Sequence, residues 1–372
     1  MGGLHGEAQA IVWHCQANWL RQLSNWDEAV ERYERSLRAF RAAGNKLGEG
    51  QVLSDLGNVY QAIGNWQRAA ECYTQALPLK RQYALPQDLA STINNLAVAQ
   101  ADLGEPAQAL ETLAEALAIY RQHKAEAALG QALINRGNFL VRLGQLESAR
   151  AAYEESLHLL TVSNNRWDLP SAWNGLGNVR RHLGELSEAA EMYQHSLAAA
   201  QEVNDITRQE QAIGNLGVIA QLRGLWVEAE GYYRHALELC EEIGDQTGAA
   251  TWWLNIGTVL GLRGEENLSL PYFERALKLA RQGGDRAREG AALLNLGNVC
   301  RNTERFAEAE TYYADAREIA DALQDVRLKA RVCSSQGSLF AIAQRPTEVR
   351  ALYVRAQELY QQCGDAYGQV EM

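Results

Sequence analysis

Residues 283–300 read GGDRAREGAALLNLGNVC, and this stretch decides the fold because its pattern recurs along the whole chain. Stepping away from Gly297 in intervals of forty reaches a glycine or alanine every time, with no insertion or deletion. A period of about 20 to 50 residues is typical of a repeat array, in which each unit packs only against its neighbours. The nine small residues stand at positions 17, 57, 97, 137, 177, 217, 257, 297 and 337.

Each forty-residue unit is expected to form a helical hairpin. A second glycine usually follows the small residue by seven positions, as Gly64 follows Gly57, and ends one helix before the next begins. Most units then close on glycine or asparagine, followed by a residue suited to a helix N-cap. These N-caps are expected at Asn45, Asn165, Asp205, Asp245, Asp285, Asp325 and Asp365, whereas YALPQD (83–88) and RQHKAE (121–126) depart from the pattern.

The composition is that of a globular chain of 372 residues, 47% apolar and 22% charged. No run approaches about 18 apolar residues and the start, MGGLHGEAQA, has no signal-peptide pattern, so we expect a cytoplasmic protein without membrane contact. A formal net charge of −11 argues against nucleic acid as a partner, because phosphate binding needs a surplus of lysine and arginine.

Sequence motifs that carry catalytic or metal chemistry are missing. The six cysteines are scattered without a CxxC pair, which indicates neither a zinc site nor a disulfide framework. We find no GxxxxGK[ST] loop, no HExxH and no GxSxG motif. We therefore expect a protein that is not an enzyme and that binds no metal or cofactor.

Sixteen positions after the small residue stands tyrosine in seven units, Phe273 in the seventh and Leu113 in the third. A helical hairpin with these small and aromatic positions resembles the tetratricopeptide repeat, in a forty-residue form similar to that of LGN/Pins adaptors and of some bacterial regulators. The resemblance implies an all-α fold, a right-handed superhelical solenoid of nine hairpins that spans residues 1–372. Residues 365–372 are then the start of a truncated tenth repeat. Neither end shows a polar capping helix, so we expect a piece of a longer protein that can associate end to end.

Asparagine gathers on one face of every first helix. At about 100° per residue, the offsets −6, −2, +1 and +5 from the small residue lie opposite the face that packs on the second helix. Eleven of the chain's 20 asparagines occupy these 36 positions, far more than even scattering would place there. In the resembling family this face lines the concave groove, which implies that the asparagines hold the main chain of an extended peptide. The alternative is that they bond to the next repeat and fix the stacking of hairpins.

Arginine and histidine beside this stripe would make the groove locally positive and suit a peptide with acidic residues. The alternative is that these arginines contact helix-end carbonyls or a neighbouring acidic side chain. The candidate peptide-binding residues are Asn58, Asn95, Asn135, Asn138, Asn178, Asn215, Asn255, Asn295, Asn298, Arg142, Arg181, His182 and Arg301.

Three functions follow from this interpretation. The first is an interaction scaffold that binds an extended peptide of a partner protein through an asparagine ladder. The second is the ligand-sensing arm of a larger signalling or transcription regulator of the nucleotide-switch type. The third is a response-regulator phosphatase or a peptide-pheromone receptor.

Overall fold

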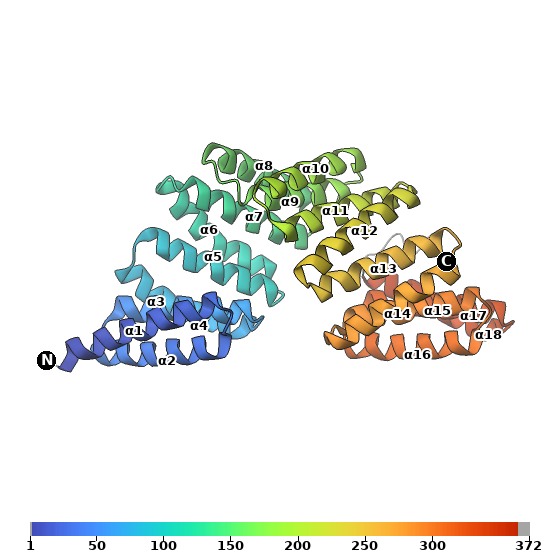
Figure 1. Ribbon diagram of the computed structural model, residues 1–372, viewed down its shortest axis with the longest axis horizontal. Coiled ribbons are helices and arrows are strands. Elements are labelled where there is room, and N and C mark those ends of the chain that lie inside the picture. Colours follow the sequence, from blue (N-terminus) through green and yellow to red (C-terminus); the bar gives the residue numbers. More distant parts are fainter. Residues whose placement is uncertain (1, 364–372) are drawn as a thin grey trace. The chain divides into compact units, whose positions relative to one another are not determined.

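A computed structural model describes residues 2–363, with side chains from residue 6 onward. Within that range the chain is all-α, and eighteen helices follow one another in consecutive pairs (Figure 1). The expected nine hairpins are therefore confirmed over the described residues, whereas the expected tenth repeat at 365–372 lies outside them.

The chain divides into two compact units, Met1–Val203 and Asn204–Met372. In both units, the helices of one hairpin pack on each other and each second helix packs on the first helix of the next hairpin, as a solenoid requires. The first unit contains α1 (Gly2–Gln22), α2 (Trp26–Ala43), α3 (Lys46–Ala62), α4 (Trp66–Tyr83), α5 (Pro86–Asp102), α6 (Pro106–Gln122), α7 (Glu126–Arg142), α8 (Leu146–Val162), α9 (Leu169–His182) and α10 (Leu186–Glu202). The second contains α11 (Ile206–Leu222), α12 (Trp226–Ile243), α13 (Gln246–Leu262), α14 (Glu266–Gln282), α15 (Arg286–Asn302), α16 (Phe306–Ala322), α17 (Val326–Ile342) and α18 (Pro346–Gln362).

A left-handed residue ends the first helix of every hairpin. Glycine takes this place in six hairpins, as at Gly144 with φ +71°, where it avoids the clash that a Cβ atom would cause. Ser24, Glu304 and Gln344 adopt the same conformation in the other three, with φ between +56° and +62°. Lys124 is also left-handed, so the atypical RQHKAE junction keeps the geometry of the others.

Most of the expected N-caps are confirmed. The side chains of Asn45, Asp205, Asp245, Asp285 and Asp325 each accept a backbone N–H in the first turn of the following helix. The prediction for Asn165 is wrong, because α9 begins three residues later, after Asp168. Asn165 instead donates from Nδ2 to Asp168 at 2.8 Å, and Pro170 stands in the first turn, where its missing N–H costs nothing. Asp365 lies outside the described residues.

A glycine at the centre of a first helix makes room for an aromatic ring of the second helix. A Cβ atom built on Gly137 would lie 2.6 Å from Cζ of Tyr153, and one on Gly177 would lie 2.6 Å from Cε1 of Tyr193. Both tyrosines are at most 1% exposed. The ring crosses beneath the first helix, so its hydroxyl reaches the opposite side of that helix, where the asparagine stripe lies.

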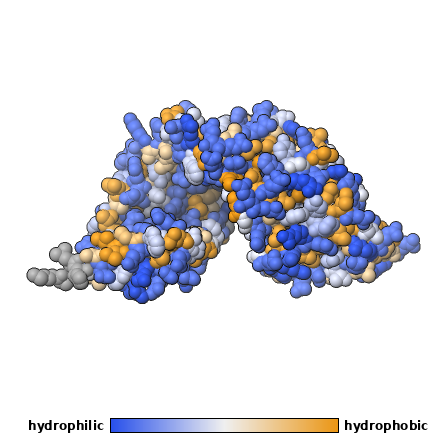
Figure 2. Space-filling model, in the orientation of Figure 1, coloured by the Kyte–Doolittle hydropathy of each residue, from blue (hydrophilic) through white to orange (hydrophobic). Residues whose placement is uncertain are grey.

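Figure 2 shows a visible surface that is mainly hydrophilic, with smaller apolar areas between the charged side chains. No helix among residues 2–363 is long and apolar enough to cross a membrane.

Candidate functional site

Four of the predicted ligand-contacting residues line one cavity of the first unit, with a volume of about 320 Å³. First helices α5, α7 and α9 supply most of its wall, and α8 contributes a tyrosine from behind. We call it the groove cavity. Its lining residues are Val98, Asp102, Asn135, Asn138, Phe139, Val141, Arg142, Tyr153 and Asn178.

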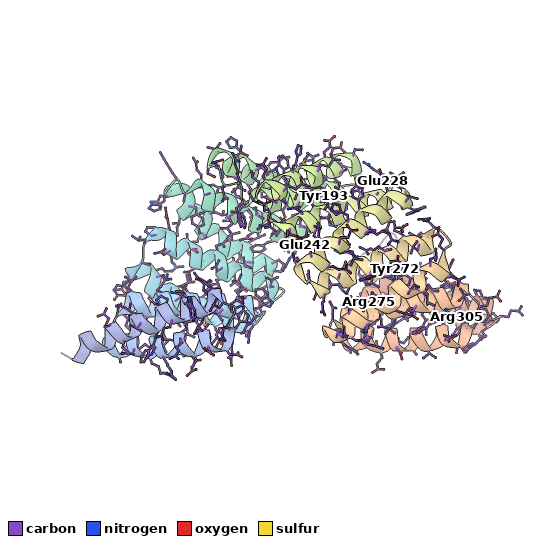
Figure 3. All side chains as sticks on the ribbon, in the orientation of Figure 1. Tyr193, Glu228, Glu242, Tyr272, Arg275 and Arg305 are labelled. Atoms are coloured by element: carbon purple, nitrogen blue, oxygen red, sulfur yellow. The ribbon has the colours of Figure 1, made fainter. Side chains whose placement is uncertain are left out.

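The asparagine that follows the small residue accepts a hydrogen bond from the buried tyrosine of its own hairpin. Tyr153 donates to Oδ1 of Asn138 at 2.6 Å, and Tyr193 donates to Oδ1 of Asn178 at 2.8 Å. Figure 3 shows Tyr193 on α10. The same bond, 2.7 to 2.8 Å long, joins Tyr33 to Asn18, Tyr73 to Asn58 and Tyr313 to Asn298.

Burial makes these hydroxyls depend on their partners, because a buried O–H group without an acceptor is costly. Burial raises the pKa of Tyr33 and of Tyr313 to about 12, and it raises the pKa of Tyr193 as well. The tyrosines therefore remain neutral donors at any ordinary pH.

Sequence reasoning missed this role of the tyrosine, although the sequence carries a signal for it. Two hairpins have no tyrosine at this position, because Leu113 and Phe273 stand there. The same two hairpins have Val98 and Thr258 in place of the asparagine. In the sixth hairpin Val218 stands in place of the asparagine, and Gln221 accepts the hydrogen bond from Tyr233 at 2.8 Å instead. Asparagine thus occurs at this position only where a tyrosine hydroxyl needs an acceptor.

The asparagines two positions before the small residue make a different bond in the first unit. Nδ2 of Asn135 donates to Oδ1 of Asn94 at 3.0 Å, and Nδ2 of Asn95 donates to Oδ1 of Asn58 at 3.0 Å. These bonds join first helices of successive hairpins, which is the stapling considered as the alternative. Each of them uses only part of the hydrogen-bonding capacity of the amide.

The arginines of the candidate site differ in how far their charge is offset. Arg142 donates to the carbonyl of Ala101 at 2.6 Å and to Asp102 at 2.7 Å, which is the helix-end contact considered as the alternative. Arg181 forms no ion pair within the described part of the chain, and its buried Nε has no hydrogen-bond partner there. His182 is exposed beside it, and desolvation together with the Arg181 charge lowers the pKa of His182.

Two cavities described in the second unit, one beside Cys240 and one beside Trp226, are lined by none of its candidate residues. Asn255 and Asn295 are half-buried, and Asn215 has a bonding partner. Arg301 donates to Oδ1 of Asn302 at 3.1 Å and so remains close to its own helix.

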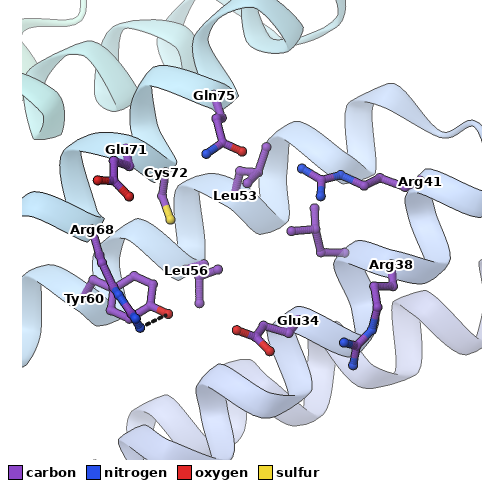
Figure 4. Close-up of a pocket in the computed structure, with 11 residues that line it drawn as sticks. Glu34, Arg38, Arg41, Leu53, Leu56, Tyr60, Arg68, Glu71, Cys72 and Gln75 are labelled. Atoms are coloured by element: carbon purple, nitrogen blue, oxygen red, sulfur yellow. Dashed lines mark hydrogen bonds between the residues drawn. The ribbon is translucent and has the colours of Figure 1, made fainter.

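A second cavity of about 400 Å³ lies between α2, α3 and α4, and Figure 4 shows its lining. It contains none of the predicted site residues. Arg41 is held by Glu49 and Arg68 donates to the hydroxyl of Tyr60 at 3.3 Å, so most of its cationic groups already have partners. Across residues 6–363, no cluster of three histidine, cysteine, aspartate or glutamate side chains could hold a metal ion.

The tetratricopeptide repeat family matches residues 8–82, 88–161, 128–202 and 208–282, and a second form of the same repeat matches residues 292–327. These matches cover most of the chain. The chain is a tetratricopeptide repeat protein. A comparison with curated protein sequences found no match.

Solved tetratricopeptide structures share the fold at low sequence identity. The apo form of RapI is 12% identical, with a TM-score of 0.70 over 96% of this chain and 99% of that one. A signal-transduction ATPase with numerous domains and a tetratricopeptide repeat sensor, from Pyrococcus horikoshii, is 13% identical, with a TM-score of 0.68 over 93% of this chain and 54% of that one. Aspartyl phosphate phosphatase F from Bacillus subtilis is 14% identical, with a TM-score of 0.62 over 75% and 72%.

Proposed function

We propose that this tetratricopeptide protein is an interaction scaffold that captures an extended peptide of a partner protein in the groove cavity. The observation that carries the proposal is the pair of amide nitrogens, Nδ2 of Asn138 and Nδ2 of Asn178. Both residues line the cavity, and neither nitrogen has an acceptor among the described residues. Peptide carbonyls are the acceptors that such groups bind, and each bond is worth about 0.5–1.5 kcal/mol.

An acidic residue in the ligand suits the same region. Arg181 follows Asn178 by three positions on α9 and therefore lies on the same side of that helix. A guanidinium without an ion pair forms short charge-assisted bonds with a carboxylate. The residues that line the cavity include no serine, cysteine or histidine, which favours binding over catalysis.

Peptide selection tests this proposal. Peptides enriched from a random display library on the full chain should bind it, and the double variant Asn138→Ala, Asn178→Ala should weaken their binding by at least about tenfold, because two donors are lost. The variant Asn18→Ala removes the same type of tyrosine partner outside the cavity and controls for stability. Selected peptides that bind the double variant as tightly as the wild type would contradict the proposal.

A second candidate function is the sensor arm of a larger regulator. Its support is the fold likeness to the Pyrococcus horikoshii ATPase, which has a tetratricopeptide repeat sensor. A response-regulator phosphatase has a parallel support in the fold likeness to aspartyl phosphate phosphatase F. A peptide-pheromone receptor has it in a Rap protein solved in complex with competence and sporulation factor, which is 12% identical with a TM-score of 0.57. Reading the coding sequence that flanks these 372 residues separates the two main candidates, since a nucleotide-binding module joined to the array would favour the sensor arm.

A further inference from the structure

We propose that buried hydrogen bonds fix the polarity of the groove cavity, so that Asn138 and Asn178 act as donors, Asn135 acts as an acceptor, and the cavity reads the direction of a bound main chain. Tyr153 and Tyr193 are then positioning residues. This inference rests on the proposed function and adds a specificity that an unconstrained asparagine ladder lacks.

The donor half of the pattern follows from the buried tyrosines. Tyr153 is 1% exposed, and its hydroxyl hydrogen has Oδ1 of Asn138 as its acceptor at 2.6 Å. Rotating the amide by 180° would bring Nδ2 to the hydroxyl and leave that hydrogen without an acceptor, which is unfavourable for a buried donor. The amide therefore keeps its oxygen toward the tyrosine and its two N–H groups available to a ligand.

Arg181 strengthens this orientation in the next hairpin. The guanidinium lies close enough to the Tyr193 hydroxyl to oppose the rise that burial causes in its pKa. A cation beside the hydroxyl oxygen turns the O–H dipole away from itself, and the hydrogen then points to Oδ1 of Asn178. The Tyr193 hydroxyl and the Arg181 charge together keep Oδ1 of Asn178 toward the tyrosine and leave its Nδ2 to donate to a ligand.

The acceptor half follows from the bond between hairpins. Asn135 uses one N–H of Nδ2 to donate to Asn94 at 3.0 Å, which holds Nδ2 toward the neighbouring hairpin, and its Oδ1 has no donor among the described residues. Asn135 and Asn138 stand three residues apart on α7, so their side chains are neighbours on one face. One helical turn of α7 thus offers an acceptor followed by a donor.

This order can distinguish the two directions of a peptide. Along one edge of an extended chain, the N–H and C=O of one residue are closely spaced, whereas that C=O and the next N–H on the edge are widely spaced. A ligand N–H at Oδ1 of Asn135 followed by a ligand C=O at Nδ2 of Asn138 is therefore a close pair in one chain direction and a wide pair in the other, so the fixed separation of the two side chains favours one direction. An amide that could rotate freely would accept both directions.

Isosteric Asn→Asp variants of the full chain test the pattern, because aspartate keeps the acceptor oxygens and loses the donor. Dissociation constants should be measured for a peptide selected on the wild type by display. Asn138→Asp and Asn178→Asp keep an acceptor for their tyrosines and should each weaken binding by about tenfold. Asn135→Asp keeps the acceptor and should stay within about threefold of the wild type. Asn18→Asp makes the same change beside Tyr33, outside the cavity, and its unfolding temperature controls for stability.

The outcomes separate the two proposals. Loss of affinity in the alanine double variant, together with wild-type affinity in Asn138→Asp, would overturn the fixed polarity and leave the proposed function standing. Equal losses in Asn135→Asp and Asn138→Asp would overturn it as well. If Asn138→Asp fails to fold, Asn178→Asp decides alone, since it makes the same change in the next hairpin. Wild-type affinity in the alanine double variant would overturn the proposed function and this inference together.

Discussion

Two buried glutamates of the array are held in opposite ways, although both are less than 10% exposed. Glu210 accepts a hydrogen bond from the indole N–H of Trp252 at 2.5 Å and has no cation beside it among the described residues, and burial raises its pKa. Glu49 is also desolvated, but hydrogen bonds from Lys46 and Arg41 hold its pKa below the usual value. Glu210 therefore favours folding when it is protonated, and Glu49 favours folding when it is ionised.

These two shifts predict opposite pH dependences of stability. The native state keeps the Glu210 proton to a higher pH than the unfolded chain, so stability falls as the pH rises from about 4.5 through the raised native pKa. Glu210→Gln should therefore raise the unfolding temperature at pH 7.5 and leave it nearly unchanged at pH 4.

The matched variant Glu49→Gln should behave in the opposite way. The contribution of Glu49 is present above the unfolded-state pKa and is lost as the pH falls through the lowered native pKa. Glu49→Gln should thus lower the unfolding temperature at pH 7.5 and lose this effect in acid. Parallel pH profiles for the two variants, measured by circular dichroism, would contradict both assignments.

At the same scale, the stripe of asparagines could be predicted from helical spacing, but which atom of each amide, Oδ1 or Nδ2, remains for a ligand could not. Spacing indicates which side of a helix a residue faces. Whether Asn138 offers a donor or an acceptor depends on the hydroxyl of Tyr153, fifteen residues away on another helix. The pairing of tyrosine with asparagine across the repeats was a usable signal that the spacing argument did not include.

The elements themselves follow closely from the forty-residue period, and their turns carry a testable cost. Glu304 adopts φ +62° at the turn where Gly264 has φ +76° in the preceding hairpin. A non-glycine residue in this conformation costs roughly 1–2 kcal/mol of stability. Glycine avoids this cost, but its greater freedom in the unfolded chain offsets part of the gain.

Glu304→Gly should therefore raise the free energy of unfolding by about 0.5–1 kcal/mol. Urea titration followed by circular dichroism measures this, with Glu308→Gly, four residues later inside α16, as the control. The control should be destabilising, because glycine weakens a helix interior by about 1 kcal/mol. A loss of stability in both variants would show that the turn gains nothing from glycine.

The start of α9 is the element boundary that the repeat period placed wrongly. The period favoured Asn165 as N-cap, yet the helix begins after Asp168, with Pro170 in its first turn. Proline prefers the first turn of a helix, so local chemistry overrides the periodic position. The preference of proline was readable in the sequence, whereas the bond that ties Asn165 to Asp168 was not.

For the whole molecule, the division into two units predicts that a substitution which destabilises one unit leaves the stability of the other unchanged. Gly214 on α11 lies against the ring of Trp252 on α13, where a Cβ atom would come within 2.0 Å of Cη2. Gly214→Ala must displace that ring and should cost about 1–3 kcal/mol in the second unit.

Hydrogen exchange followed by mass spectrometry can localise this effect. Amides of residues 204–363 should exchange faster in Gly214→Ala, while those of residues 6–122 should be unchanged, because each repeat contacts only its neighbours. Gly231→Ala is the matched control, since its Cβ atom would meet nothing within 4 Å. Faster exchange throughout the chain would contradict independent units.

The third hairpin has no tyrosine–asparagine pair, and this affects how a peptide with a repeating sequence would bind. Identical sites spaced at equal intervals let a periodic guest slip from one to the next and bind in several frames of nearly equal energy. Val98 stands in the groove cavity where its neighbours carry Asn58 and Asn138, and it offers no polar group to a main-chain carbonyl. A guest displaced by one hairpin would lose a bond at that step, so within the first unit a single hydrophobic residue distinguishes one binding frame from the next.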